Sequence, residues 1–304
     1  ITGFELDINN EFVKVEFSEG IYGDTLQSSG IDKNDLSLSF SQNGGDATAC
    51  IIDSVRNTSG NDLSGGESNV NVYLSFTGTP SGVETIEIQP DDTTIVDADD
   101  NYCALTETTG IITLNDGSKY HLVYEDFEHG GNLPAGWSNV NLLGNTDWEA
   151  KDGGHNGNPA GAYEGSYNAR LYYGGYSTQK TKFVTPEIDF GNYKKNPKLK
   201  FYHAQAEWQN DQDELKIYYK TSSGGTWKEL VHYQSDVSSW TGREIGLPFV
   251  NDTYYLAFEG ITNYGYGVCV DNVDVLAEEG YTPHPPSLEK PMDNENDISV
   301  LSGY

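Results

Sequence analysis

The chain has 304 residues, with 17 Lys or Arg against 47 Asp or Glu, so its formal net charge at pH 7 is −30. Phosphate backbones and anionic lipid repel such an acidic chain, which argues against nucleic acid or a membrane surface as a partner. No apolar run approaches the length of about 18 residues that a membrane helix needs, so we expect no membrane insertion.

The residue mix favours strands and turns. Gly occurs 34 times, and Tyr outnumbers Phe by 21 to 11. A single Met and only three Cys suit a secreted protein exposed to oxidation. Three Cys allow at most one disulfide, and the sequence does not decide whether Cys50 and Cys103 form it. Composition therefore predicts a soluble, extracellular, β-rich protein.

The first 117 residues predict short strands separated by turns. Apolar and polar residues alternate with period two, which is typical of strands with one face on a core. The clearest segments are Val13–Phe17, Leu36–Phe40, Val70–Phe76, Thr85–Ile88 and Thr109–Leu114. Seven or eight such strands at a spacing of about 8–12 residues indicate an immunoglobulin-like β-sandwich over residues 1–117.

Residues 118–278 are richer in Trp and Tyr and predict a second sandwich, of the jelly-roll type. The strands expected here are Leu199–His203, Leu215–Lys220, Trp227–Leu230, Tyr254–Phe258 and Val268–Val275. The stretch from Asn139 to Gly175 lacks periodicity and is interpreted as a long functional loop. Residues 279–304 are rich in proline and acidic residues and are interpreted as a linker or tail.

Motifs of catalysis are missing from the sequence. The six histidines form no H-E-x-x-H pair, and there is no G-x-S-x-G elbow and no phosphate-binding glycine loop. Cys269 lies within an apolar strand, where a thiol is usually an inert core residue. We therefore expect that the chain is not an enzyme.

Metal binding is the better-supported chemistry, since calcium prefers several carboxylate and carbonyl oxygens. The acidic segment Asp97–Asn101 is interpreted as a solvated turn and Asp211–Glu214 as a charged entry to a strand, rather than as calcium loops. A third set of acidic residues is scattered along the sequence and comes together only if the second sandwich folds as a jelly roll. Asp126 and Glu128 lie on the presumed first strand of the second sandwich and Asp271 on its last. These two strands commonly meet in a jelly roll, so the carboxylates would need a cation, with Asp147 as a further ligand.

Aromatic side chains form the other candidate site. Exposed rings on a sandwich would make a platform for sugars, although Tyr is also common in strands and Trp fills cores. The rings in question are Trp148, Tyr163, Tyr167, Tyr172, Tyr173, Tyr176, Trp208, Trp240, Tyr264 and Tyr266. The sequence is compatible with both interpretations, a sugar-binding platform and aromatic residues of strands and core.

The second sandwich also carries a set of ordered motifs. They are Asp126–Glu128, Leu133–Trp137, Asp147–Trp148, Phe183–Asp189, Leu199–Phe201 and Gly265–Val273. Together they resemble the MAM-like jelly rolls of bacterial surface proteins, the group that includes cleaved-adhesin and choice-of-anchor J domains. The first sandwich resembles the bacterial immunoglobulin-like modules found along large secreted proteins.

The resemblance implies a non-catalytic adhesion or recognition module that holds a structural calcium. The positions that match the metal-associated segments of the family are Glu128 and Asp271, with Asp126 and Asp147 beside them. The expected partners are a surface glycan or protein ligand and neighbouring domains of the same parent chain, which is secreted or at the cell surface. The alternative is a carbohydrate-binding accessory module of a secreted polysaccharide hydrolase or protease.

Overall fold

The computed structural model describes residues 1–91 and 94–280. Within these ranges, regular structure is all strand except for one 3-10 turn, η1 (His155–Gly157). None of the described residues forms a helix with the length and apolar character that crossing a membrane requires. The predicted all-β class is confirmed. The tail predicted over residues 279–304 lies outside the described residues from position 281 onward.

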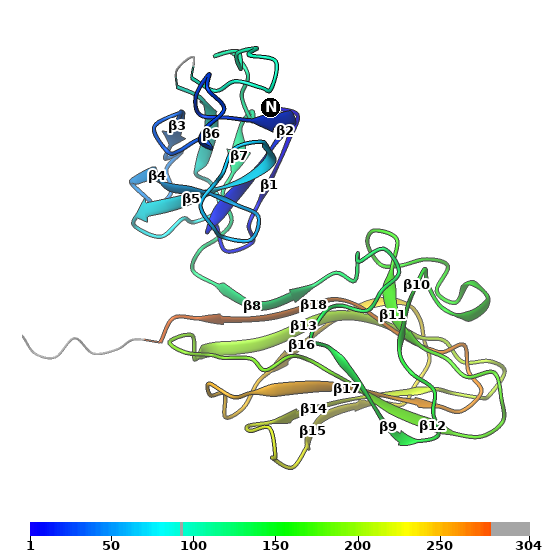
Figure 1. The fold of residues 1–304 in the computed structure, drawn as a ribbon. Coiled ribbons are helices and arrows are strands. Elements are labelled where there is room, and N and C mark those ends of the chain that lie inside the picture. Colours follow the sequence, from blue (N-terminus) through cyan, green and yellow to red (C-terminus); the bar gives the residue numbers. More distant parts are fainter. Residues whose placement is uncertain (92–93, 281–304) are drawn as a thin grey trace, which may run out of the picture.

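Two antiparallel sheets form the first body in the chain (Figure 1). One has the strand order β1-β2-β5-β4 and the other β3-β6-β7. The strands are β1 (Gly3–Leu6), β2 (Phe12–Ile21), β3 (Leu36–Ser41), β4 (Ala49–Asn57), β5 (Glu67–Thr77), β6 (Thr85–Pro90) and β7 (Ile112–Thr113). The period-two alternation places Val13, Val15, Val70 and Val72 in the core between the sheets, with no exposed surface.

A second and larger sandwich follows. Its six-stranded sheet has the order β10-β11-β18-β13-β16 with β8 also paired to β18, and its five-stranded sheet has the order β15-β14-β17-β12-β9. The strands are β8 (Tyr120–Glu125), β9 (Ser138–Leu143), β10 (Glu149–Lys151), β11 (Asn168–Leu171), β12 (Gln179–Val184), β13 (Lys195–Gln205), β14 (Glu214–Lys220), β15 (Lys228–Tyr233), β16 (Val237–Gly246), β17 (Tyr255–Thr262) and β18 (Val268–Glu278). The core between the sheets is rich in aromatic rings, among them Phe127, Trp148 and Phe183. This two-layer arrangement agrees with the sandwich predicted from the sequence.

The connection between the two sandwiches is short and hydrogen-bonded. The side chain of Asn10 donates to the backbone carbonyl of Asn115 (3.0 Å) and accepts the N–H of the same residue (2.8 Å). Asn9 forms the same kind of pair with the backbone of His121, at 2.8 and 3.1 Å. Both asparagines belong to the turn between β1 and β2, which therefore holds the start of β8 beside the first sandwich (Figure 1).

Two expectations need correction. The stretch from Asn139 to Gly175 is not one long loop, since it contains the end of β9 together with β10 and β11. These strands are short and mostly pair at sheet edges, so they show no alternation in the sequence. The possible bridge between Cys50 and Cys103 is not formed, because both are free thiols, as is Cys269.

A buried carboxylate joins two loops of the first sandwich. Glu84, which has no exposed surface, accepts hydrogen bonds from the N–H groups of Ala47 (2.9 Å) and Ser81 (2.8 Å). Burial works against ionisation of Glu84, but these donors and the N–H of Val83 outweigh it and lower the pKa to about 2. Glu84 thus ties the loop before β4 to the loop before β6.

We expect Glu84→Gln to lower the free energy of unfolding by about 2 kcal/mol at pH 7, because a neutral amide replaces a charged acceptor. The pKa is lower in the folded state than its ordinary 4.5, so the stabilisation is present above about pH 4.5 and is lost as the pH falls toward 2. Urea unfolding of the variant and the wild type at pH 7 and at pH 2 measures this. Glu5→Gln, at an exposed position, is the control. An equal loss at both pH values would contradict the assignment.

Candidate functional site

Two strands, β8 and β11, share one edge of β18, and the unpaired stretch between them, a gap along that edge, brings distant segments of the chain together. β8 pairs with β18 up to Glu125 opposite Val273, and β11 pairs with the same strand from Ala169 opposite Val270. Asp271 and Asn272 lie between these two stretches. The chain leaves the sheet after β8 and returns before β11 at this gap. The segments 126–128 and 161–167 therefore meet beside Asp271.

Two carboxylates hold the returning loop. Asp271 accepts hydrogen bonds from the N–H groups of Tyr163 (2.9 Å) and Glu164 (3.4 Å). Oε1 of Glu128 accepts from the N–H groups of Ser166 and Tyr167, both at 2.7 Å. Oε2 of Glu128 makes no hydrogen bond within the described residues. Glu128 and Asp271 thus hold the same loop.

A glycine makes this close approach possible. Gly165 has a φ of +67°, a left-handed conformation that favours glycine, and a Cβ at this position would overlap the carboxyl group of Glu128. Glycine at this position therefore lets the loop between Glu164 and Ser166 wrap around the Glu128 carboxylate without displacing it.

The electrostatics of the pair favour a cation. Asp271 has no exposed surface, and burial raises its pKa to about 7 although three N–H groups oppose the rise. The negative charge of Glu128 raises this pKa further. A cation between two carboxylates relieves both the burial and the repulsion, and hard cations prefer such oxygens.

Asp126 does not lie on a strand as predicted, because β8 ends at Glu125. Phe127 has a φ of +63° and turns the chain so that its own ring enters the core with no exposed surface. Asp126 accepts the N–H of Glu128 at 3.1 Å and converges with Glu125 and His129 rather than with Asp271. The turn at Phe127 thus separates Asp126 from the Glu128–Asp271 pair.

Asp147 is exposed in the loop between β9 and β10, and its carboxylate accepts a hydrogen bond from the side chain of Asn141 at 2.9 Å. The neighbouring Trp148 is buried in the core, and its indole N–H donates to the carbonyl of Thr181 at 3.0 Å. This anchor ties the Asp147 loop to β12 on the five-stranded sheet. No contact within the described residues joins Asp147 to Glu128 or Asp271.

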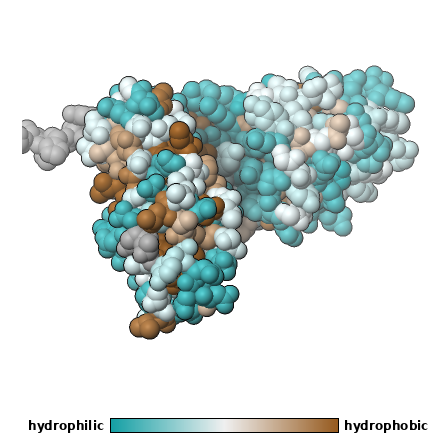
Figure 2. All heavy atoms as spheres, turned by 90° about the horizontal axis from the view of Figure 1, so that it is seen from above, coloured by the Kyte–Doolittle hydropathy of each residue, from teal (hydrophilic) through white to brown (hydrophobic). Residues whose placement is uncertain are grey.

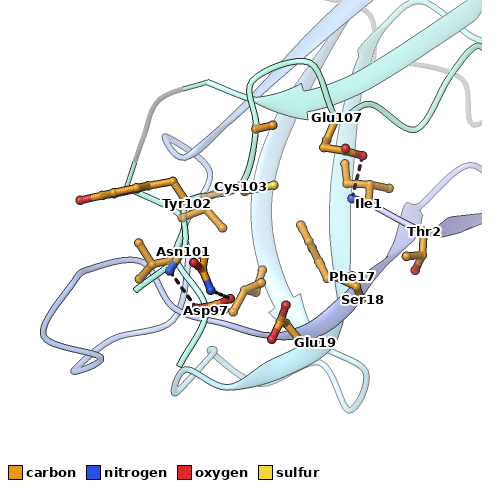
Figure 3. Close-up of a pocket in the computed structure, with 14 residues that line it drawn as sticks. Ile1, Thr2, Phe17, Ser18, Glu19, Asp97, Asn101, Tyr102, Cys103 and Glu107 are labelled. Carbon is orange, nitrogen blue, oxygen red and sulfur yellow. Dashed lines mark hydrogen bonds and ion pairs between the residues drawn. The ribbon is translucent and has the colours of Figure 1, made fainter. Parts of the chain in front are cut away.

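The acidic segment Asp97–Asn101 forms a turn closed by its own hydrogen bonds. The Asp97 carboxylate accepts from the side chain of Asn101 (2.8 Å) and from the N–H groups of Asn101 (2.9 Å) and Asp99 (2.7 Å). The Asn101 side chain holds the pKa of Asp97 below its ordinary value. Figure 3 shows this turn at the rim of a pocket of about 350 Å³ in the first sandwich, where Phe17 and Cys103 supply apolar wall.

An aromatic pocket of about 180 Å³ lies on the second sandwich. Its walls come from four separate segments of the chain, and the lining residues are His155, Asn156, Tyr172, Trp208, Tyr264, Gly265 and Tyr266. The His155 and Tyr172 rings stack with centroids 3.9 Å apart, and Trp208 meets Tyr264 edge to face at 5.2 Å. Tyr176 is 91% exposed and stacks on Tyr264 outside the lining of the pocket. Sequence analysis identified the Tyr and Trp members but missed His155 and Asn156.

A second buried carboxylate shapes this pocket. Asp213 is 1% exposed and accepts the N–H groups of Asn263 (2.5 Å), Gly265 (3.0 Å) and Gly267 (2.7 Å). Burial raises its pKa. The Asp213 side chain therefore holds three backbone positions of the loop that carries Tyr264 and Tyr266. The sequence had assigned it to a charged strand entry.

The other predicted aromatic residues have different environments. Trp148 is a core residue, 1% exposed, and does not belong to any exposed platform. Tyr163 stacks on Tyr202 with centroids 3.5 Å apart, and Trp240 donates its indole N–H to the carbonyl of Gly161 at 2.8 Å. These rings cover the loop that Asp271 and Glu128 hold.

No protein-family model matches the chain, and no curated protein matches it. Among solved structures, the chain is similar to the K3 cleaved adhesin domain of Lys-gingipain from Porphyromonas gingivalis w83. The identity is 20% and the TM-score 0.40, over 52% of this chain and 98% of that one. It is also similar to TmCBM61 in complex with β-1,4-galactotriose, with 14% identity and a TM-score of 0.38 over 53% and 99% of the two chains.

A third similar structure is the CBM22-1 xylan-binding domain from Paenibacillus barcinonensis Xyn10C. Its identity is 11% and its TM-score 0.37, over 54% of this chain and 98% of that one. By name these three are adhesin and carbohydrate-binding domains.

We expect Asp213→Ala to lower the free energy of unfolding by about 2–4 kcal/mol, because three N–H groups lose their acceptor. Amide hydrogen exchange of residues 263–267 should become faster in the same variant. The matched control is Asp211→Ala, since Asp211 is exposed and bonds only through its backbone. If the two variants were equally stable, the role given to Asp213 would be wrong.

Proposed function

We propose that this chain is a non-catalytic recognition module of a larger extracellular protein and that it binds a saccharide in the aromatic pocket of the second sandwich. The observation that carries the proposal is the convergence of Tyr172, Trp208, Tyr264 and Tyr266 around one small cavity. Adhesion to a surface glycan is the function this geometry supports best.

The chemistry of the pocket suits a sugar ring. Sugars have an apolar C–H face that packs on aromatic rings and a rim of hydroxyl groups that need hydrogen bonds. A cavity of about 180 Å³ holds the volume of about six waters, enough for a small ring. Burial and the charge of Arg170 lower the pKa of His155, so its neutral imidazole offers one donor and one acceptor. Asn156 adds an amide at the rim.

The first sandwich is assigned to a spacer role. Its strand order β1-β2-β5-β4 and β3-β6-β7 matches the ABED and CFG sheets of a constant-type immunoglobulin domain, which supports the immunoglobulin-like assignment. Its core ends at Leu114, and the core of the second sandwich starts with Leu122. These limits support a division into domains at residues 1–117 and 118–278.

A structural calcium ion is the second part of the proposal, with Glu128 and Asp271 as its ligands. Oε2 of Glu128 is free of hydrogen bonds within the described residues, and the fully buried Asp271 faces a second carboxylate. A bound Ca²⁺ would neutralise both groups and keep the loop 161–167 in place. The loop's backbone carbonyls are the natural source of further oxygen ligands.

Trp208→Ala and Tyr172→Ala should each weaken saccharide binding about tenfold or more, because each removes a ring face from the pocket. A glycan array with the full chain identifies the ligand, and isothermal titration with that glycan measures the loss. Trp227→Ala is the matched control, since Trp227 does not line the pocket.

Two results would count against the saccharide assignment. One is an array without any bound glycan, which would leave a protein ligand as the candidate. The other is glycan binding that survives both pocket variants, which would place the binding surface elsewhere on the chain.

Calcium should raise the melting temperature of the EDTA-treated chain by about 5–10 °C at a hundredfold excess over Kd. Glu128→Gln and Asp271→Asn should abolish this rise, because each removes a charged ligand. Asp147→Asn, at an exposed position with no contact to the pair, should keep it. A rise that persists in both ligand variants would refute these two assignments.

The calcium response should also depend on pH. Without metal, the raised pKa of Asp271 means that the folded state holds its proton more tightly than the unfolded chain. This contribution to stability is present below about pH 4 and is lost as the pH rises through about 7. Calcium therefore competes with a proton at pH 5 but not at pH 8, and we expect the larger thermal shift at pH 8.

A further inference from the structure

A pocket of about 860 Å³ lies between the two sandwiches. Glu5, Asp7 and Asn71 line it from the first sandwich, and Glu125, Asp126 and His129 from the second. The two hydrogen bonds between the side chain of Asn9 and the backbone of His121 hold these two walls together. Neither the calcium proposal nor the aromatic pocket uses this space.

Three side chains on the second wall converge on one point. Glu125, Asp126 and His129 each offer a ligand atom, and these atoms lie within 4.8 Å of one another. Nε2 of His129 lies 3.0 and 3.2 Å from the two carboxylate oxygens of Glu125. The left-handed turn at Phe127 folds the chain back so that a histidine four residues after Glu125 reaches it. Within the described ranges, no other group of three or more His, Cys, Asp and Glu side chains meets this condition.

The pocket is poor in compensating positive charge. Lys14 lines it but pairs with Glu16 at 3.0 Å and with Glu5 at 3.9 Å, both on the first sandwich, and His121 pairs with Asp274 at 2.7 Å. Of the ion pairs within the described residues, only the one with His129 reaches Glu125, which is 8% exposed, and none reaches Asp126. A cation would therefore be stabilised at this wall.

An independent observation comes from the opposite wall. Asn71 on β5 is 6% exposed and lines the same pocket, yet its Oδ1 makes no hydrogen bond. Leaving a buried amide oxygen unpaired costs about 1–3 kcal/mol. The two ends of an Asn amide are interchangeable by rotation, so the oxygen can be turned toward an occupant of the pocket. A hydrated cation would supply the donor that this oxygen lacks.

We propose that Glu125, Asp126 and His129 bind a divalent transition metal ion of the zinc class in the pocket between the two sandwiches. One imidazole and two carboxylates are ligands that Zn²⁺ accepts at four-coordinate sites, whereas Ca²⁺ takes six to eight oxygens. Three protein ligands would leave one position for a water in the pocket that Asn71 also lines. The site is separate from the proposed calcium ligands Glu128 and Asp271.

The test is isothermal titration of the full chain with Zn²⁺ in buffer that holds excess Ca²⁺. We expect one ion per chain and binding at least tenfold weaker in His129→Gln and in Glu125→Gln. The His129 side chain is 47% exposed and the Gln amide keeps a hydrogen-bond donor for Glu125, so we expect a metal-free melting temperature close to that of the wild type. The matched control is His232→Gln, which removes the histidine of another Glu–His pair, with Nε2 2.6 Å from Glu214.

Cobalt gives a second readout. Co²⁺ bound by the wild type should show the visible absorption of a four-coordinate site, and His129→Gln should lose it. The proposal is overturned if the wild type binds no Zn²⁺, if His129→Gln binds it as tightly as the wild type, or if His232→Gln weakens binding equally. The calcium and saccharide proposals would stand in each of these cases, since they rest on other residues.

Discussion

β18 is the strand on which the second sandwich depends. It pairs with β13 along one edge and with both β8 and β11 along the other. Because β8 and β11 share that edge without touching end to end, Asp271 and Asn272 lie in the gap between them. Asn272 adopts a φ of +45°, a conformation that asparagine tolerates better than most residues, where the register with β13 shifts. The loop that covers this gap is then held by carboxylates rather than by a sheet.

Buried carboxylates that hold loops through backbone N–H groups also occur at the aromatic pocket and in the first sandwich. Asp271 and Asp213 each accept several backbone N–H groups from a loop far away in the sequence, and Glu84 accepts one from such a loop and one from its own. A carboxylate has two oxygens and can accept from several donors, so a single buried acid replaces many side-chain contacts. In a chain with 34 glycines and a net charge of −30, this is how irregular segments obtain defined positions.

Sequence patterns located the long strands well and the functional loops poorly. Val70–Phe76 and Leu215–Lys220 lie within β5 and β14, because their alternation reflects a core on one face. The meeting of Glu128 with Asp271 followed from the expected pairing of the first and last strands. The strand assigned to Asp126–Glu128 was wrong, since a left-handed residue in its middle has no signature when that residue is Phe. The aromatic pocket draws on four segments whose proximity depends on the whole fold.

Apolar side chains gather on the end of the first sandwich that faces away from the second (Figure 2). The reciprocal hydrogen bonds between Asn9 and His121 join the two sandwiches, and they have a consequence for any partner that touches both. Two bodies on a flexible tether lose rotational freedom when one ligand bridges them, and this loss opposes binding. Here the ordering has already taken place during folding. A bridging partner therefore meets a preorganised surface, and its affinity carries little entropic penalty from the joint.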